Sequence, residues 1–323
     1  MRDRLLISVV MPLYNKGEEV SRAVKSVLEQ TVSDFELIIV NDGSTDNGPR
    51  IVRSIRDPRI RVIDQENAGV AAARNRGIEE AQGVLVAFLD ADDEWSPDFL
   101  ATIIRLKHNF ASCDVVLTSY YYSSPGGQKR LIYFRGAPKR SWEGIKNFSF
   151  SYDFDPPISM SAFAVTKEAI TSIGGFTVGN KFGEHLLTWV RLLIKYEVAY
   201  STHPCSIYWA PTSARPDRLP QYPDTVGQEL ERLILESKPS RVSELRQITA
   251  SWYRRRGIMN ILLGEKKRAS QEIHNAMNIL GKTWDLRMLA LISKTPKSVS
   301  KFILMILKRG KAINRNFKAI ISK

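Results

Sequence analysis

The chain has little cysteine and no long hydrophobic run, and each absence excludes a class of protein. Cys113 and Cys205 are the only cysteines among 323 residues, and neither belongs to a Cys-x-x-Cys motif. This argues for a reducing, cytoplasmic compartment and against a disulfide framework or a zinc site. No stretch reaches the roughly 18 apolar residues that cross a bilayer. The first strand is expected from residue 5, with no signal peptide before it.

The composition is that of a folded and strongly basic protein. Hydrophobic residues make up 43% of the chain, so disorder is not indicated, and the length predicts one or two domains. The formal net charge is +13, and it is unevenly spread. No acidic residue follows Asp285, whereas ten Lys or Arg do. The charge therefore points to a basic C-terminal segment rather than to a uniformly basic surface.

Short apolar runs alternate with helical patterns through the N-terminal half. The runs do not alternate with polar residues, which is typical of strands buried on both faces. Such alternation with short loops predicts an α/β fold with a mostly parallel sheet flanked by helices. Pro12 is expected to end the first strand, because it cannot continue a central ladder. The expected strands are residues 7–12, 35–40, 59–63 and 84–89, and the expected helices are residues 18–30, around 51–55, and 70–81.

The most informative strand runs directly into three carboxylates, Asp90, Asp92 and Asp93. Open α/β sheets bind ligands at the carboxyl edge of their strands. In an extended segment, Asp90 and Asp92 would point the same way. Paired carboxylates suit a hard divalent cation that shares its other positions with phosphate oxygens. The alternative is a solvated acidic turn after a strand.

Four motifs extend this pattern through the first hundred residues. They are Val9-Val10-Met11-Pro12-Leu13-Tyr14-Asn15, Val40-Asn41-Asp42-Gly43-Ser44-Thr45-Asp46, Asn67-Ala68-Gly69 with Ala73-Arg74-Asn75, and Leu89-Asp90-Ala91-Asp92-Asp93. In order and spacing the chain resembles the family 2 glycosyltransferases over roughly residues 5–210. The resemblance implies the Rossmann-like GT-A fold and an inverting, metal-dependent transfer from a nucleotide-diphosphate sugar, most simply a UDP-sugar.

The resemblance also implies a role for each matching residue. Asp92 would ligate Mg²⁺ or Mn²⁺, and Asp93 would support it. Asp42 would accept hydrogen bonds from the base, the alternative being an Asp that only starts a turn. Tyr14 could instead be a half-buried core aromatic, and Arg74 a solvated charge on a helix face. The residues implied to bind the nucleotide sugar are Pro12, Tyr14, Asn15, Asp42, Arg74, Asp90 and Ala91.

The second catalytic segment departs from the family pattern. Residues 174–176 and 181–185 match it, but the family's base Asp is replaced by His185, which follows Glu184. His185 could be the base, since imidazole titrates near neutral pH. Glu184 could act instead, or activity could be lost. The acidic residue four positions further on is also missing, leaving Thr188 nearby. The expected function is glycosyl transfer; the alternative is an inactive nucleotide-sugar- or glycan-binding subunit.

Prolines predict a boundary between two regions. The expected division is a catalytic domain over residues 1–210, a Pro-rich linker over 211–225 and a helical region over 226–323. Residues 252–276 resemble one helical hairpin of tetratricopeptide type. The basic tail carries apolar residues such as Phe302 and Ile306, and predicts contact with an anionic membrane surface. A packed last helix is the alternative. Nucleic acid is not expected, because no such motif occurs.

These features give one functional hypothesis. The chain is expected to transfer a sugar to a hydroxyl of a glycan or lipid-linked glycan in cell-surface polysaccharide synthesis. It would lie in the cytoplasm, peripherally on the inner face of the plasma membrane. A dehydrogenase is disfavoured, because the first strand is followed by residues 12–17 rather than by a Gly-x-Gly-x-x-Gly loop.

Overall fold

The computed structural model describes residues 7–132, 141–146, 158–180, 183–210 and 219–307. The chain divides into two compact units. One comprises residues 1–149 and 154–218, and the other comprises residues 150–153 and 219–323. The division falls within the expected Pro-rich linker, of which residues 211–218 lie outside the described part.

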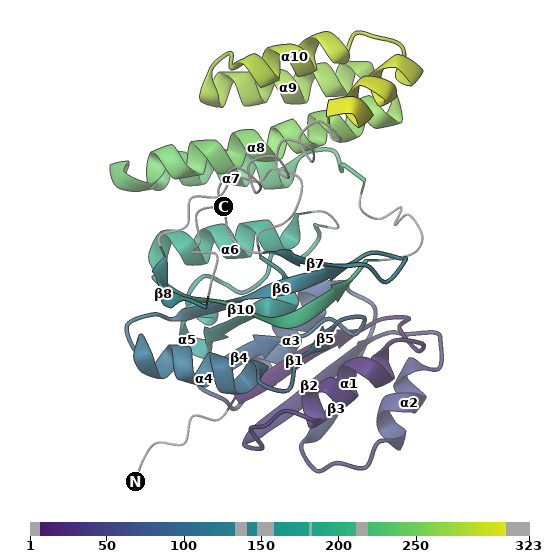
Figure 1. The fold of residues 1–323 in the computed structure, drawn as a ribbon, viewed down its shortest axis with the longest axis vertical. Coiled ribbons are helices and arrows are strands. Elements are labelled where there is room, and N and C mark those ends of the chain that lie inside the picture. The colour runs from purple at the N-terminus through teal and green to yellow at the C-terminus, as the bar shows by residue number, and fades with distance from the viewer. Residues whose placement is uncertain (1–6, 133–140, 147–157, 181–182, 211–218, 308–323) are drawn as a thin grey trace. The chain divides into compact units, whose positions relative to one another are not determined.

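The first unit is built on one sheet of ten described strands, in the order β3-β2-β1-β4-β9-β6-β10-β5, with β7 beside β6 and β8 beside β10 (Figure 1). The expected strands are present, although the fourth is shorter and leaves Val84 exposed. The strands are β1 (Ile7–Leu13), β2 (Phe35–Asp42), β3 (Ile60–Gln65), β4 (Leu85–Phe88), β5 (Glu94–Trp95), β6 (Val115–Ser123), β7 (Lys129–Ile132), β8 (Glu143–Lys146), β9 (Phe163–Thr166) and β10 (Val198–Trp209).

The sheet is more mixed than the sequence predicted. Strands β1 to β4 pair in parallel, as expected, but β9 runs antiparallel to both β4 and β6. The expectation that Pro12 ends β1 is wrong, since Pro12 is in register with Val40 of β2. Pairing with β4 stops at Val10. Proline is therefore tolerated where β1 has a ladder on one side only.

Helices cover the two faces of the sheet. Side chains of α1 and α4 join one core cluster with Val9 and Met11 of β1. On the opposite face, α3 lies so close to β1 that a Cβ at Gly77 would come within 2.3 Å of Val10 Cγ1. The alternating side chains of one buried strand therefore supply both cores. The helices are α1 (Val20–Leu28), α2 (Gly48–Ser54), α3 (Val70–Glu80), α4 (Phe99–Asn109), α5 (Lys167–Ser172) and α6 (Glu184–Lys195), with a 3₁₀ turn, η1 (Met160–Ala162).

The second unit is helical, as expected. Its buried centre is Arg256, whose Nε lies 2.8 Å from Glu272 Oε1 and 3.2 Å from Asp224 Oδ2. The predicted helical hairpin is formed by the second and third helices, with Gly264 in the left-handed conformation between them. No helix among the described residues is long and apolar enough to span a membrane. The helices are α7 (Thr225–Glu236), α8 (Pro239–Leu263), α9 (Lys266–Leu280), α10 (Trp284–Ile292) and a last helix over residues 297–307.

Candidate active site

The three carboxylates after β4 lie on a tight turn. Asp93 N donates to Asp90 O at 2.9 Å, so the extended arrangement expected for Asp90 and Asp92 is wrong. The turn nevertheless brings one carboxylate oxygen of each of the three residues within 4.8 Å of the others. Ala91 is buried inside the turn. The turn thus brings all three carboxylates together. In an extended strand, the side chain of Asp93 would point to the opposite face from that of Asp92.

Asp93 supports this turn from the interior. Its side chain is fully buried and accepts hydrogen bonds from Ser161 Oγ at 2.5 Å and from Trp209 N at 3.1 Å. Burial, and then the nearby charges of Asp92 and Asp90, raise the pKa of Asp93 well above its usual range. The residue therefore joins the acidic turn to η1 and to the end of β10.

Basic side chains surround the turn, and the sequence analysis missed two of them. Lys16 Nζ lies 2.8 Å from Asp92 Oδ2, and Arg22 Nη2 donates to Asp92 O at 2.6 Å. Arg74 Nη2 lies 2.5 Å from Asp90 Oδ1. The turn is thus already neutralised in part by the protein. The sequence signal for Lys16 was its position directly after Asn15 in the loop that follows β1.

Arg74 connects the acidic turn with the second catalytic segment. Its side chain is 1% exposed, so the alternative of a solvated helix charge is wrong. Its Nη1 lies 3.4 Å from His185 Nδ1, which lies 3.1 Å from Glu184 Oε1. Glu184 and His185 are in the first turn of α6. A continuous polar chain therefore runs from Asp90 through Arg74 and His185 to Glu184.

Asn75, the neighbour of Arg74, fixes the backbone at Phe176. Asn75 Nδ2 donates to Phe176 O, and Phe176 N donates to Asn75 Oδ1, both at 2.8 Å. Gly175 has a φ of +68°, and a Cβ there would come within 2.5 Å of Asn75 Oδ1. Thr188 Oγ1 of α6 lies 3.4 Å from Gly175 O. Helix α3 thus holds both His185 and the glycine turn that packs against α6.

Asp42 ends β2, as expected, and orders the loop before α3. Its carboxylate accepts hydrogen bonds from Gln65 Nε2 at 2.7 Å and from the backbone N–H groups of Ala68 and Gly69, both at 2.9 Å. The side chain is buried. Asp42 therefore does more than start a turn, because it places residues 67–69 beside the carboxyl edge of β2.

The loop after β1 is joined to the loop after β2. Asn15 has a positive φ of 49°, and its Oδ1 accepts from Thr45 N at 2.8 Å. Tyr14 is exposed, so the alternative of a core aromatic is wrong, whereas Pro12 is buried in β1. The structure brings Asn15 next to the β2 loop and Lys16 next to the acidic turn. These two loops and the acidic turn form one continuous edge.

Comparisons with known proteins agree on one family. The model of "Glycosyl transferase family 2" matches residues 8–168. TuaG of Bacillus subtilis (strain 168), named as a teichuronic acid biosynthesis glycosyltransferase, is 34% identical over 206 residues, which cover 62% of this chain and 77% of TuaG. YibD of Escherichia coli (strain K12), named as an uncharacterized glycosyltransferase, is 45% identical over 31% of this chain, but the match spans only 30% of YibD.

A solved structure shows the same fold. The crystal structure of S. aureus TarS 1–349 in complex with UDP-GlcNAc superimposes with a TM-score of 0.67 and 16% identity. The superposition covers 93% of this chain and 91% of that one. The expected fold, a GT-A sheet flanked by helices and followed by a helical region, is therefore confirmed.

Proposed function

Because the chain belongs to glycosyl transferase family 2, we propose that it transfers a sugar from a nucleotide-diphosphate donor to a hydroxyl group, with inversion at the anomeric carbon. The acceptor would be a glycan or lipid-linked glycan of a cell-surface polysaccharide. The observation that carries the proposal is that the acidic turn, with Asp90 paired to Arg74, lies beside the His185–Glu184 pair. It gives one site both a place for a diphosphate and a basic group.

A UDP-sugar is the donor that we propose. TarS was crystallised with UDP-GlcNAc, and its fold matches over almost the whole chain. Pro12, Tyr14, Asn15 and the loop ordered by Asp42 would form the nucleoside side of the site. Arg74 would act through Asp90, whose carboxylate it holds in place at 2.5 Å. The guanidinium group of Arg74 is already paired with Asp90, so it holds that carboxylate in position for the donor.

The acidic turn fits a divalent cation such as Mn²⁺ or Mg²⁺. Its donors are carboxylate oxygens, which hard cations prefer, and Lys16 Nζ already places a positive charge 2.8 Å from Asp92 Oδ2. Asp92 would be the principal ligand, with Asp90 beside it. The bound ion would supply Lewis acidity that offsets charge on the departing diphosphate. Lys16 would then pair with a phosphate oxygen instead of Asp92.

His185 is the base that we propose, with Glu184 as its orienting partner. A carboxylate 3.1 Å from Nδ1 favours the tautomer that carries its proton on Nδ1. Nε2 is then the basic nitrogen, which would take the proton of the attacking hydroxyl. Glu184 is negatively charged and lies closer to Nδ1 than Arg74 Nη1 does, which is 3.4 Å away. Nδ1 is therefore expected to donate a hydrogen bond to Glu184 rather than to accept one from Arg74.

The test separates donor binding from transfer. UDP, GDP and dTDP would be titrated calorimetrically with and without Mn²⁺, and UDP-sugars would then be screened for hydrolysis. We expect Mn²⁺-dependent binding of UDP with slow release of sugar. Sugar release that is lost in His185→Ala but not in Lys25→Met, a variant of an exposed lysine, would support the base assignment. Binding without any release, even with lipid-linked acceptors, would favour the inactive subunit, and no binding would refute the donor site.

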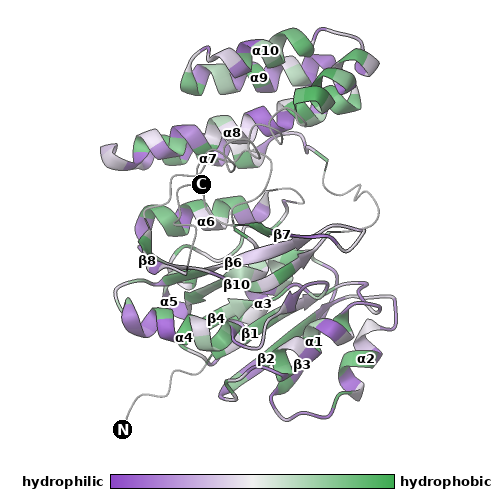
Figure 2. Cartoon of the chain, viewed as in Figure 1, coloured by the Kyte–Doolittle hydropathy of each residue, from purple (hydrophilic) through white to green (hydrophobic). Residues whose placement is uncertain are grey.

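The last helix supports a membrane-surface partner. Val299, Phe302, Met305 and Ile306 are exposed at the spacing of one helix face. Figure 2 shows this helix, yellow in Figure 1, as predominantly hydrophobic. Residues 308–323, which carry much of the expected basic tail, lie outside the described part. We propose that this face rests on the anionic inner surface of the plasma membrane, each nearby basic residue adding about 1 kcal/mol.

Vesicle binding tests this partner. The full chain should co-sediment with vesicles that contain phosphatidylglycerol, and salt should weaken the binding. Phe302→Glu should reduce binding strongly. Leu235→Glu is the matched control, because Leu235 is an 86% exposed apolar residue on α7 of the same unit. Equal binding to neutral vesicles, or equal losses in both variants, would contradict the proposal.

A further inference from the structure

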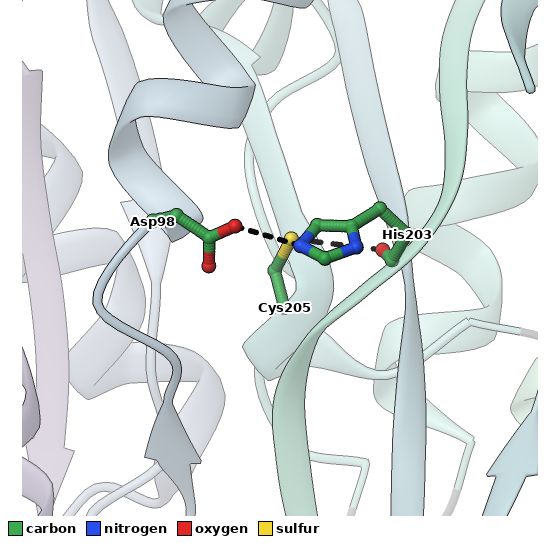
Figure 3. A group of neighbouring side chains, drawn as sticks. All are labelled: Asp98, His203 and Cys205. Atoms are coloured by element: carbon green, nitrogen blue, oxygen red, sulfur yellow. Dashed lines mark hydrogen bonds and ion pairs between the residues drawn. The ribbon is translucent and has the colours of Figure 1, made fainter. Parts of the chain in front are cut away.

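A second group of metal-ligating side chains lies outside the acidic turn. Asp98 precedes α4, and His203 and Cys205 are two residues apart on β10 (Figure 3). The pairing of β10 with β6 is irregular on both sides of Pro204, and this irregular segment places His203 and Cys205 together beside Asp98. Asp98 Oδ2 lies 2.7 Å from His203 Nε2, and one ligand atom of each residue lies within 4.8 Å of the others.

We propose that Asp98, His203 and Cys205 bind Zn²⁺, with water as the fourth ligand. One oxygen, one nitrogen and one sulfur ligand suit a borderline cation such as Zn²⁺, whereas the all-carboxylate turn suits Mg²⁺ or Mn²⁺. The two sets share no residue, so this site does not rest on the proposed transfer reaction. It would join the start of α4 to β10, the strand whose last residue, Trp209, donates to Asp93.

A neighbouring hydroxyl group holds Asp98 as second-sphere partners hold known metal ligands. Ser96 Oγ donates to Asp98 Oδ1 at 2.7 Å, while Oδ2 faces His203. Ser96 Oγ also lies 3.1 Å from the backbone carbonyl oxygen of Cys205, whose thiol donates to His203 O at 3.6 Å. To bind a metal, the Cys205 sulfur would give up its hydrogen bond to this carbonyl and coordinate as the thiolate.

The geometry needs a small adjustment to admit the ion. Zinc bonds of about 2.0–2.3 Å in a tetrahedron place ligand atoms about 3.3–3.8 Å apart. Asp98 and His203 would therefore separate by roughly 0.6–1 Å from their hydrogen bond. Their side chains are 45% and 49% exposed, which leaves them room to move and gives the ion a path from solvent. Cys205 is buried and would stay in place.

The bound ion must displace the thiol proton. The buried thiol of Cys205 donates its proton to His203 O, so the sulfur is protonated before zinc arrives. Metal binding should therefore release about one proton per ion from this residue. Calorimetric titration of Zn²⁺ in buffers of different ionisation enthalpy would measure that release.

Cobalt substitution tests the site directly. The full chain, stripped of metal, would be titrated with Co²⁺ without nucleotide, and the thiolate-to-cobalt charge-transfer absorption followed. We expect a one-to-one band that Zn²⁺ removes. Cys205→Ser should abolish it, and His203→Ala should weaken Co²⁺ binding at least tenfold. Cys113→Ser is the matched control, since Cys113 is also buried and free, and should keep the band.

The outcomes separate this site from the catalytic one. Asp92→Asn should leave the cobalt band unchanged, because that residue belongs to the acidic turn. No band in the unmodified protein, or a band that survives Cys205→Ser, would overturn the proposal and leave Asp98 and His203 as a hydrogen-bonded pair. Zinc should also raise the unfolding temperature of the unmodified protein but not of Cys205→Ser.

Discussion

Lys16→Met should change metal binding and nucleotide binding in opposite directions. In the structure, Lys16 Nζ is 2.8 Å from Asp92 Oδ2, so it competes with a cation for that oxygen. Its removal should make Mn²⁺ alone bind more tightly. Once the ion is bound, however, the lysine is expected to pair with a phosphate oxygen. UDP should therefore bind more weakly to the Mn²⁺-loaded variant.

The expected size of both effects follows from the burial of the pair. Lys16 is 26% exposed and Asp92 is 14% exposed, so the pair is better shielded than a surface ion pair. An interaction of about 1 kcal/mol, at the upper end for exposed pairs, corresponds to roughly fivefold in affinity. We therefore expect about fivefold tighter Mn²⁺ binding and about fivefold weaker UDP binding.

Two calorimetric titrations measure this, one of Mn²⁺ without nucleotide and one of UDP in saturating Mn²⁺. Lys25→Met is the control, because it removes the same charge from a 73% exposed position that pairs with Glu29. Weaker Mn²⁺ binding in Lys16→Met would refute the competition. Equal shifts in Lys25→Met would show that only the net charge matters.

Four further variants test other parts of the structure. Asp92→Asn should remove Mn²⁺-dependent UDP binding in calorimetry while leaving the circular dichroism spectrum unchanged. His185→Ala should bind UDP normally but lose sugar transfer, and unchanged turnover would eliminate it as the base. The Cys205 pKa is raised from 9.0 to about 12, so its stabilising effect is complete below pH 9 and is lost as pH rises towards 12. In metal-free protein, Cys205→Ala should therefore lack a loss of roughly 1 kcal/mol in unfolding free energy between pH 7 and pH 10, measured by urea titration. Arg256→Met should destabilise the helical unit by about 3–5 kcal/mol, because it leaves buried Glu272 without its cation. A thermal unfolding midpoint within a degree of the unmodified protein would contradict this last expectation.

The sequence located the parts of the site that follow buried strands. Asp42 and the acidic cluster were placed correctly at the ends of β2 and β4. The end of a buried strand can be recognised in the sequence because the run of apolar residues stops there. Periodicity does not reveal the direction of pairing, which is why the antiparallel β9 was not foreseen. It also cannot distinguish a short extension from a turn, and so the arrangement of Asp90 and Asp92 was wrong.

Contacts between distant segments were beyond the sequence. Lys16 and Asp92 meet because β1 and β4 are adjacent and parallel, so the loops after them share one edge. Asp98 and His203 are 105 residues apart, and Cys205 lies outside any cysteine motif. The spacing of cysteines could exclude a local zinc motif, but it could not exclude ligands that folding brings together.

The adjacent residues Arg74 and Asn75 of α3 limit how segments can be exchanged between related enzymes. Arg74 touches Asp90 and His185, and Asn75 holds Phe176 by two hydrogen bonds. A chimera that takes residues 158–210 from a relative, but keeps its own α3, would preserve these contacts only if the new segment presents the same partners to Arg74 and Asn75. The crossover point that preserves these contacts lies before α3 rather than at the end of the family motifs. Specificity for the acceptor is therefore expected to transfer only with the helix that carries Arg74 and Asn75.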